Sequence, residues 1–301
     1  MKLRNILMVV ATMGIMFSSA DRTGVVGYTA GDYTDMNTFA HKAAGQNVAY
    51  TSGTNFAAVW SDGGTTWGFR GGDTDDMVNM LWSNGTYGLD VAMSMDSATN
   101  GDGTTFDLGF GMNLMGYDVG FNMDTAENGP MSLNLRGNCN FWVWDTMTFG
   151  YNAATTTSGT DYTSIDVGMY SVNEWGPATG YFSMGITSSD NPAWTNDGAA
   201  LWADPVTLIN TSFSVESTLT DWCDLRMGYT KNFNTAPADG ERESVDSFVA
   251  GVGFNYGSVA LDMTLANNVL DDMMSNPLYY INGRNNDDSA LAASWTLSYT
   301  W

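Results

Sequence analysis

Charged residues are scarce in this chain, and basic residues are the scarcest of them. Only 14% of the 301 residues are charged, against about 25% in a typical soluble domain. Ten are Lys or Arg and 33 are Asp or Glu, so the formal net charge is -23 at pH 7. Without a basic surface the chain lacks the footprint that nucleic-acid binding requires, and we expect no nucleic-acid partner. The low share of charge is consistent with a wall whose outer face meets lipid.

Residues that commonly carry catalysis or bind cofactors are also few. His41 is the single histidine, so a Ser-His or Asp-His hydrolytic site would have to use that one residue. The two cysteines, Cys139 and Cys223, form no CxxC pair, and the sequence contains no phosphate-binding loop or Cys/His metal spacing. We therefore predict a protein that is not an enzyme and has no cofactor. The cysteines fall on strands about four apart, too distant for a disulfide, and we expect free thiols.

Long apolar runs are absent except near the start. Lys2 and Arg4 precede an apolar run over residues 6–17, and small residues follow at 18–20. This order predicts a secretory signal peptide over residues 1–20, with the mature chain beginning at Asp21. The run is shorter than the roughly 20 residues that a spanning helix needs. Its removal would leave eight basic against 33 acidic residues.

Alternation of apolar and small polar residues is what the chain has in quantity, and the last thirteen residues are the clearest case. The odd positions from Leu291 to Trp301 are apolar, and the even positions are Ala, Ser or Thr. This ending resembles the closing strand of bacterial outer-membrane β-barrels. The resemblance implies the bacterial outer membrane and its lipid as surroundings, and it implies recognition by the barrel-assembly machinery. The assembly signal would comprise Trp295, Leu297, Tyr299 and Trp301.

The same period of two recurs from residue 54 to the end and predicts an all-β fold, a transmembrane antiparallel β-barrel. We predict about 14 strands, with a range of 12 to 16, over residues 54–301. Runs at 106–112 and 117–123 form a tight hairpin. Short and long connections alternate, which indicates short periplasmic turns and longer outer loops. Residues 21–53 lack clean alternation and are either a plug or a first strand after a disordered start.

Polar residues on the other face of each strand are the candidate pore lining. Assigned by alternation, they are Asp90, Asp107, Asp118, Arg136, Asp166, Glu216, Asp224, Arg226 and Asp262. Seven acids against two bases favour a porin-like channel for passive diffusion of small solutes that prefers cations. The alternative to an open channel is that these acids pair with the two arginines and fill the lumen.

Two further functions stay open, a transporter of hydrophobic solutes similar to the fatty-acid transporters and a filled-lumen structural or docking barrel. Four aromatic residues that the alternation assigns to the inner face are compatible with both functions; they are Trp142, Trp144, Tyr170 and Tyr181. Because Asp145 falls on the lipid side by the same alternation, we expect a bulge near Trp144. Association of barrels into a homo-oligomer is a further possibility that the sequence leaves open.

Many acids fall in the predicted outer loops, where carboxylate oxygens could attract Ca²⁺. The best local candidate for a metal site comprises Asp96, Asn100 and Asp102. Its spacing departs from the EF-hand pattern and lacks the terminal Glu, which favours the alternative of a solvated loop.

Overall fold

The computed structural model describes residues 20–28, 30–72, 76–95, 104–155, 161–190, 195–196, 199–200, 206–237, 243–265 and 292–301. The predicted signal peptide and the candidate Ca²⁺ residues Asp96, Asn100 and Asp102 lie outside these ranges, apart from Ala20. Within them, no helix has the length and apolarity needed to cross a membrane.

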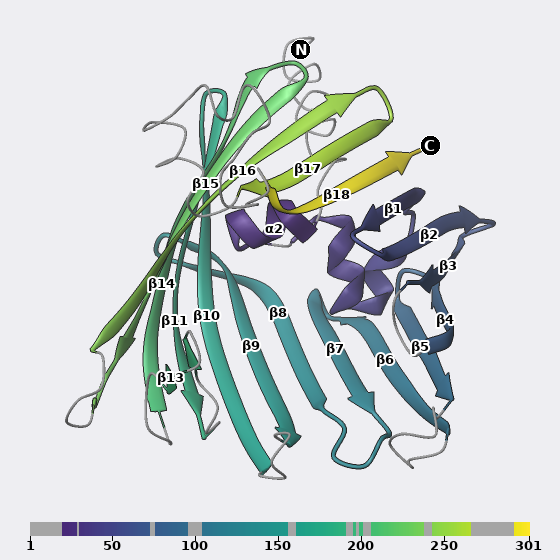
Figure 1. Ribbon diagram of the computed structural model, residues 1–301, viewed down its shortest axis with the longest axis horizontal. Helices are drawn as coiled ribbons and strands as arrows, with labels where there is room; N and C mark the ends of the chain where they lie inside the picture. Colours follow the sequence, from purple (N-terminus) through teal and green to yellow (C-terminus); the bar gives the residue numbers. More distant parts are fainter. Residues whose placement is uncertain are drawn as a thin grey trace, which may run out of the picture.

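Sixteen antiparallel strands form a closed barrel, which confirms the predicted fold (Figure 1). Sixteen is the upper end of the predicted range. The strands are β1 (Val48–Ser52), β2 (Asn55–Asp62), β3 (Thr65–Gly71), β4 (Asp76–Ser83), β5 (Tyr87–Met95), β6 (Thr104–Leu114), β7 (Tyr117–Asp124), β8 (Met131–Phe141), β9 (Trp144–Thr155), β10 (Asp161–Trp175), β11 (Ala178–Ser189), β14 (Val206–Thr220), β15 (Cys223–Asn234), β16 (Ser244–Tyr256), β17 (Val259–Leu265) and β18 (Ala292–Thr300). A separate two-stranded sheet joins β12 (Thr195–Asn196) and β13 (Ala199–Ala200).

The wall closes where the first strand meets the last. Val48 pairs with Thr300 and Ser52 with Thr296, so β18 lies between β1 and β17. The wall therefore begins at Val48, six residues before the predicted boundary at 54. Closure matters in a membrane because it leaves no strand edge with unpaired backbone groups.

Alternation in the strands separates an apolar outer face from a polar inner face. On β5, Tyr87, Leu89 and Val91 are 45%, 45% and 39% exposed, while Ala92 is buried on the other face. Exposed aromatic residues gather at the end of the barrel that carries the short turns; they are Trp60, Trp67, Tyr87, Tyr117, Trp175, Tyr256, Tyr299 and Trp301. Such a girdle marks a membrane interface, and by the turn-length rule this end is periplasmic.

One inward assignment was wrong. Trp142 is 87% exposed and lies in the turn between β8 and β9, with φ at 56°. The β8–β9 register shifts between Asn138 and Phe141, which is the expected irregularity, and Trp144 just beyond it is 7% exposed and stacks on the ring of Phe182, which is itself 39% exposed. The sequence pattern did not reveal that the irregularity begins before Trp142.

Residues 20–28 and 30–47, which we call the inner segment, lie within the barrel (Figure 1). The segment contains the helix α2 (Ala20–Val26) and two 3-10 helices, η1 (Tyr33–Asn37) and η2 (Ala40–Ala43). Apolar residues of η1 and η2 pack against the wall in one cluster; its members are Tyr33, Met36, Ala40, Ala43, Val48, Val59 and Leu81. Met36 and Ala43 are fully buried. Burial of this kind holds η1 and η2 against β1, β2 and β4.

Candidate functional site

The inner segment is held at two places on the inner face of the barrel. α2 contacts β14 to β18, and η2 contacts β4, β5 and β6. Because these strands lie in different parts of the closed wall, the segment runs across the lumen from one to the other (Figure 1). The wall residues at η2 lie in the periplasmic half of their strands, whereas those at α2 include Thr264, near the outer end of β17.

A row of three glycines receives the backbone of η2. Gly88, Gly111 and Gly120 are direct neighbours across β5, β6 and β7. A Cβ at Gly88 would lie 2.2 Å from the carbonyl carbon of Ala40, and one at Gly120 would lie 2.2 Å from the carbonyl oxygen of Thr38. No larger residue fits at these distances. Next to this glycine row, Ser83 donates a hydrogen bond of 2.9 Å to the carbonyl oxygen of His41.

Ion pairs fix η1 and η2 to the same part of the wall. Arg136 donates bonds of 2.7 and 2.6 Å to the two carboxylate oxygens of Asp35, and one of 2.9 Å to Asp118. Asp118 also contacts Lys42 Nζ at 2.8 Å and His41 Nε2 at 2.9 Å. This η cluster holds two acids, two bases and the single histidine of the chain. Its fixed charges balance when His41 is neutral.

A second cluster seats α2 on the facing wall. Arg22 donates to both carboxylate oxygens of Glu216, at 3.0 Å from Nε and 2.8 Å from Nη2. The same guanidinium donates a bond of 2.9 Å to the hydroxyl of Tyr181. Arg226 bonds Glu216 at 2.6 Å and also contacts Asp262 closely. Two further acids lie at the edge of this cluster, Asp32 at 3.8 Å from Arg22 and Asp224 at 4.0 Å from Arg226.

Backbone contacts complete this α2 seat. A Cβ at Gly228 would lie 2.1 Å from the carbonyl oxygen of Val25, so glycine is required there also. Ser214 donates a bond of 2.6 Å to the carbonyl oxygen of Val26. Asp21 accepts bonds from Thr296, at 2.5 Å, and from Thr264, at 3.2 Å. The short helix is thus bonded to β14, β17 and β18.

Electrostatics keep the buried groups of the inner segment in defined states. Burial lowers the pKa of Arg22, but the adjacent Glu216 carboxylate outweighs this effect and leaves the pKa raised, so Arg22 stays charged. Burial raises the pKa of Tyr33 above its usual range, so its phenol stays neutral.

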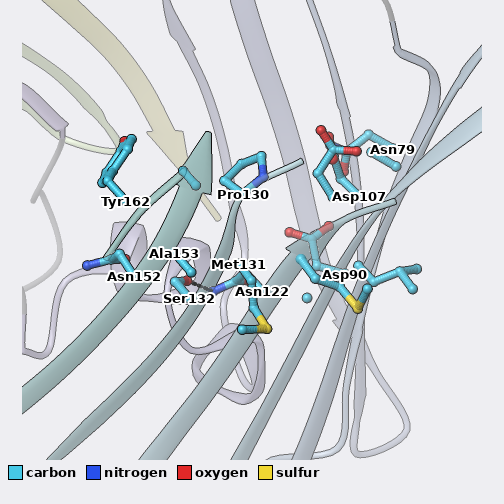
Figure 2. A pocket seen from close by; sticks show the side chains of 16 residues that line it. Asn79, Asp90, Asp107, Asn122, Pro130, Met131, Ser132, Asn152, Ala153 and Tyr162 are labelled. Atoms are coloured by element: carbon cyan, nitrogen blue, oxygen red, sulfur yellow. Dashed lines mark hydrogen bonds between the residues drawn. The ribbon is translucent and has the colours of Figure 1, made fainter. Parts of the chain in front are cut away.

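A cavity of about 610 Å³ lies at the other end of the lumen, near the long loops (Figure 2). Its lining includes Asp90, Asp107 and Asp124 together with several amide and hydroxyl side chains, which are Asn79, Asn122, Asn152, Ser132 and Tyr162. Asp107 and Asp124 are direct partners across β6 and β7. We call this space the outer cavity.

The nine predicted pore residues all lie on the inner face, but in different surroundings. Asp118 and Arg136 belong to the η cluster, and Glu216, Arg226 and Asp262 belong to the α2 seat. The other four divide between the outer cavity and local bonding. Asp90 and Asp107 line the cavity, Asp166 accepts bonds from Ser164 and Thr187, and Asp224 accepts bonds from Thr218 and Asn255.

Sequence reasoning missed three of the bases inside the barrel. Arg22 and Lys42 come from the inner segment, and Arg70 on β3 contacts Asp90 at 2.5 Å. Arg70 follows the alternation of its strand and could have been found. The other two lie where no alternation exists. Four acids inside the barrel were missed as well, Asp21, Asp32 and Asp35 of the inner segment and Asp124 at the outer cavity, so the excess of acids over bases is not smaller than the sequence indicated.

The remaining predicted sites are placed as follows. The four residues of the predicted assembly signal lie on the outer face of β18 or just after it, and Trp295, Leu297, Tyr299 and Trp301 are 43%, 41%, 49% and 56% exposed. Both cysteines are free. Within the described residues, no group of three or more His, Cys, Asp or Glu side chains could hold a metal ion.

The closed wall, its apolar outer face and its aromatic girdle define the chain as a bacterial outer-membrane β-barrel protein. No family model matches the sequence. A comparison with curated proteins finds no match.

Three similar solved structures share little sequence identity with this chain. OmpTdeltaL8, an outer membrane protein of Vibrio cholerae, is 9% identical, with a TM-score of 0.44 over 85% of this chain and 97% of that one. A bacterial polysaccharide outer membrane secretin is 10% identical, with a TM-score of 0.48 over 84% and 97%. OccK11 of Pseudomonas aeruginosa is 7% identical, with a TM-score of 0.38 over 84% and 93%. At these values the matches assign no function to this chain.

Proposed function

We propose that this barrel is a non-enzymatic outer-membrane channel for passive diffusion of small solutes, with a preference for cations. The observation that carries the proposal is the outer cavity, a space of about 610 Å³ lined by three carboxylates at the long-loop end. Solutes would gather there before they pass the inner segment. The low-dielectric wall strengthens the field of the carboxylates, which raises the local concentration of cations and repels anions.

The cation preference rests on the cavity acids rather than on the acids deeper in the lumen. Asp118, Glu216 and Asp262 each contact at least one Arg or Lys, so their charge is largely compensated. Asp90 at the cavity is paired with Arg70 as well, so the preference rests on Asp107 and Asp124. Asp107 and Asp124 lie directly opposite each other on the adjacent strands β6 and β7. Like charges in such a cross-strand pair repel each other. A diffusing cation would relieve that repulsion.

Planar-bilayer recording in a salt gradient tests the proposal. The reversal potential should lie on the cation-selective side for the wild type and move toward zero in the double variant Asp107→Asn/Asp124→Asn, because the substitutions remove charge and nearly preserve volume. Asp145→Asn is the control, since Asp145 is exposed on the outer face, where its carboxylate accepts a bond from Val172 N–H. Salt should weaken the preference, because the Debye length falls from about 10 Å at 0.1 M to about 3 Å at 1 M. A wild-type barrel without conductance, or one selective for anions, rejects the proposal.

A filled-lumen docking barrel is the second candidate, and the inner segment favours it. Its two seats place residues 20–28 and 30–47 across the lumen with buried ion pairs at both. Absence of conductance in the wild type would support this candidate.

A further inference from the structure

The two halves of the inner segment differ in how firmly they are tied to the wall. η2 ends at Ala43, and the chain enters β1 at Val48, so the wall itself holds that half covalently. α2 is separated from η1 by Gly27 and Gly31, whose φ angles are 72° and 87°. Cleavage after residue 20, as predicted, would make α2 the free end of the mature chain. The α2 half is therefore the part that can leave its seat while the η half stays.

Departure of α2 would change the charge at the middle of the lumen. In its seat, Arg22 shares Glu216 with Arg226, while Arg226 also bonds Asp262. Without Arg22 the wall retains one base, Arg226, beside Glu216, Asp262 and, at 4.0 Å, Asp224. Displacement would thus widen the lumen by the volume of a helix. Asp21 would leave together with Arg22, so the negative charge gained is local to Glu216 and is not a change in the net charge of the lumen.

We propose that α2 is a movable constriction of the channel and that Arg22 determines both how tightly it is seated and how selective the lumen is. This inference rests on the proposed channel function and deepens it. The resting barrel passes small solutes around a seated α2. The displaced state conducts more and selects more strongly for cations, because Glu216 then faces the path.

A reversible cross-link between α2 and the wall tests whether the helix moves. A Cβ at Gly251 would lie 3.7 Å from the Cβ of Val25, within the separation of about 3.5–4.5 Å that a disulfide needs. The double variant Val25→Cys/Gly251→Cys, with Cys139→Ser and Cys223→Ser, should therefore form a disulfide in the full-length mature barrel. We expect oxidation to suppress the high-conductance state and reduction to restore it.

Controls separate the cross-link from the substitutions. A Cβ at Gly251 would lie 2.9 Å from the carbonyl oxygen of Met263, so the Gly251→Cys single variant shows what that local contact does by itself. Its conductance should not respond to reductant. Heat-modifiable migration on gels verifies that each variant is a folded barrel.

Arg22 variants test the charge part of the proposal. Arg22→Gln loses the bonds to Glu216 and should raise the population of the displaced state by roughly tenfold, as expected for loss of a charge-assisted hydrogen bond. Its cation preference should exceed that of the wild type. The double variant Arg22→Gln/Glu216→Gln should keep the higher conductance and lose the added preference, since the charge left behind is gone.

The outcomes distinguish this inference from the proposed function. If the wild type conducts and the oxidised and reduced cross-link variants behave identically, α2 does not move and the inference is overturned while the channel stands. If the wild type does not conduct but Arg22→Gln does, α2 closes the lumen, which supports the movable helix and rejects an open resting channel. If none of the folded barrels conducts, both proposals fail.

Discussion

Substitution of Gly88 by alanine tests how closely the wall is fitted to the inner segment. The added Cβ would lie 2.2 Å from both the carbonyl carbon of Ala40 and the backbone nitrogen of His41. Ordinary contacts begin near 3.4 Å, so η2 must move away by about 1 Å. The closed wall cannot yield as easily, because its backbone is bonded on both sides to neighbouring strands.

The magnitude follows from the contacts that η2 gives up. Overpacking of a fitted interface costs about 1–3 kcal/mol, and loss of the Ser83 bond to His41 costs about 1 kcal/mol more. The Lys42 pair with Asp118 adds little, since the lysine side chain is 36% exposed and screened by water. The seated state of η2 should therefore lose about 2–4 kcal/mol, while the barrel stays folded.

Hydrogen exchange of the purified barrel in detergent measures this loss. The amides of Lys42 and Ala44 donate within the segment, to the carbonyl oxygens of Phe39 and His41. In Gly88→Ala their opening should become roughly 30 to 1,000 times more frequent, at about 1.4 kcal/mol for each factor of ten. Gly150→Ala is the matched control on β9, because a Cβ there meets no atom closer than 3.5 Å. Equal protection in both variants would refute the fitted seat.

Two further predictions concern the closing strand β18 and the buried Tyr33. Trp301→Asp should reduce the amount of heat-modifiable barrel in the outer membrane, because a charge at the interface costs only about 0–1 kcal/mol while the recognition feature is lost; wild-type amounts would contradict the proposed assembly signal. Alkaline pH should loosen the inner segment. Burial raises the pKa of Tyr33, so its stabilising effect is complete below about pH 10, the ordinary pKa of tyrosine, and declines above it. Exchange of the segment's amides should increase beyond its intrinsic pH dependence above pH 10 in the wild type and less in Tyr33→Phe, and an identical increase in both would exclude this cause.

The wall could be predicted because its signal is local. Side chains that face lipid must be apolar at every second position, so each strand carries its own pattern. The hairpin predicted at 106–112 and 117–123 is observed as β6 and β7; β6 is two residues longer at each end, and β7 is one residue longer at its C-terminal end. β1 was left undecided between strand and plug, because it has only five residues and Tyr50 on its inner face packs against η1.

The inner contacts could not be predicted because their partners are far apart in sequence. Asp35 and Arg136 are 101 residues apart, and Arg22 and Glu216 are 194 apart. The glycine row has the same difficulty. Gly88, Gly111 and Gly120 each fit the alternation of a lumen-facing position, and only the register of three strands shows that they form one surface for the η2 backbone.

The scarcity of basic residues and the design of the lumen are connected. The chain places Arg22, Lys42, Arg70, Arg136 and Arg226 in ion pairs inside the barrel, which is half of its ten basic residues. Four of these bases, all except Arg70, compensate acids at the two seats of the inner segment. At the outer cavity, Arg70 lies beside Asp90. Selectivity, if it is measured, should therefore depend on Asp107 and Asp124 in the resting barrel, and on Glu216 once α2 has left its seat.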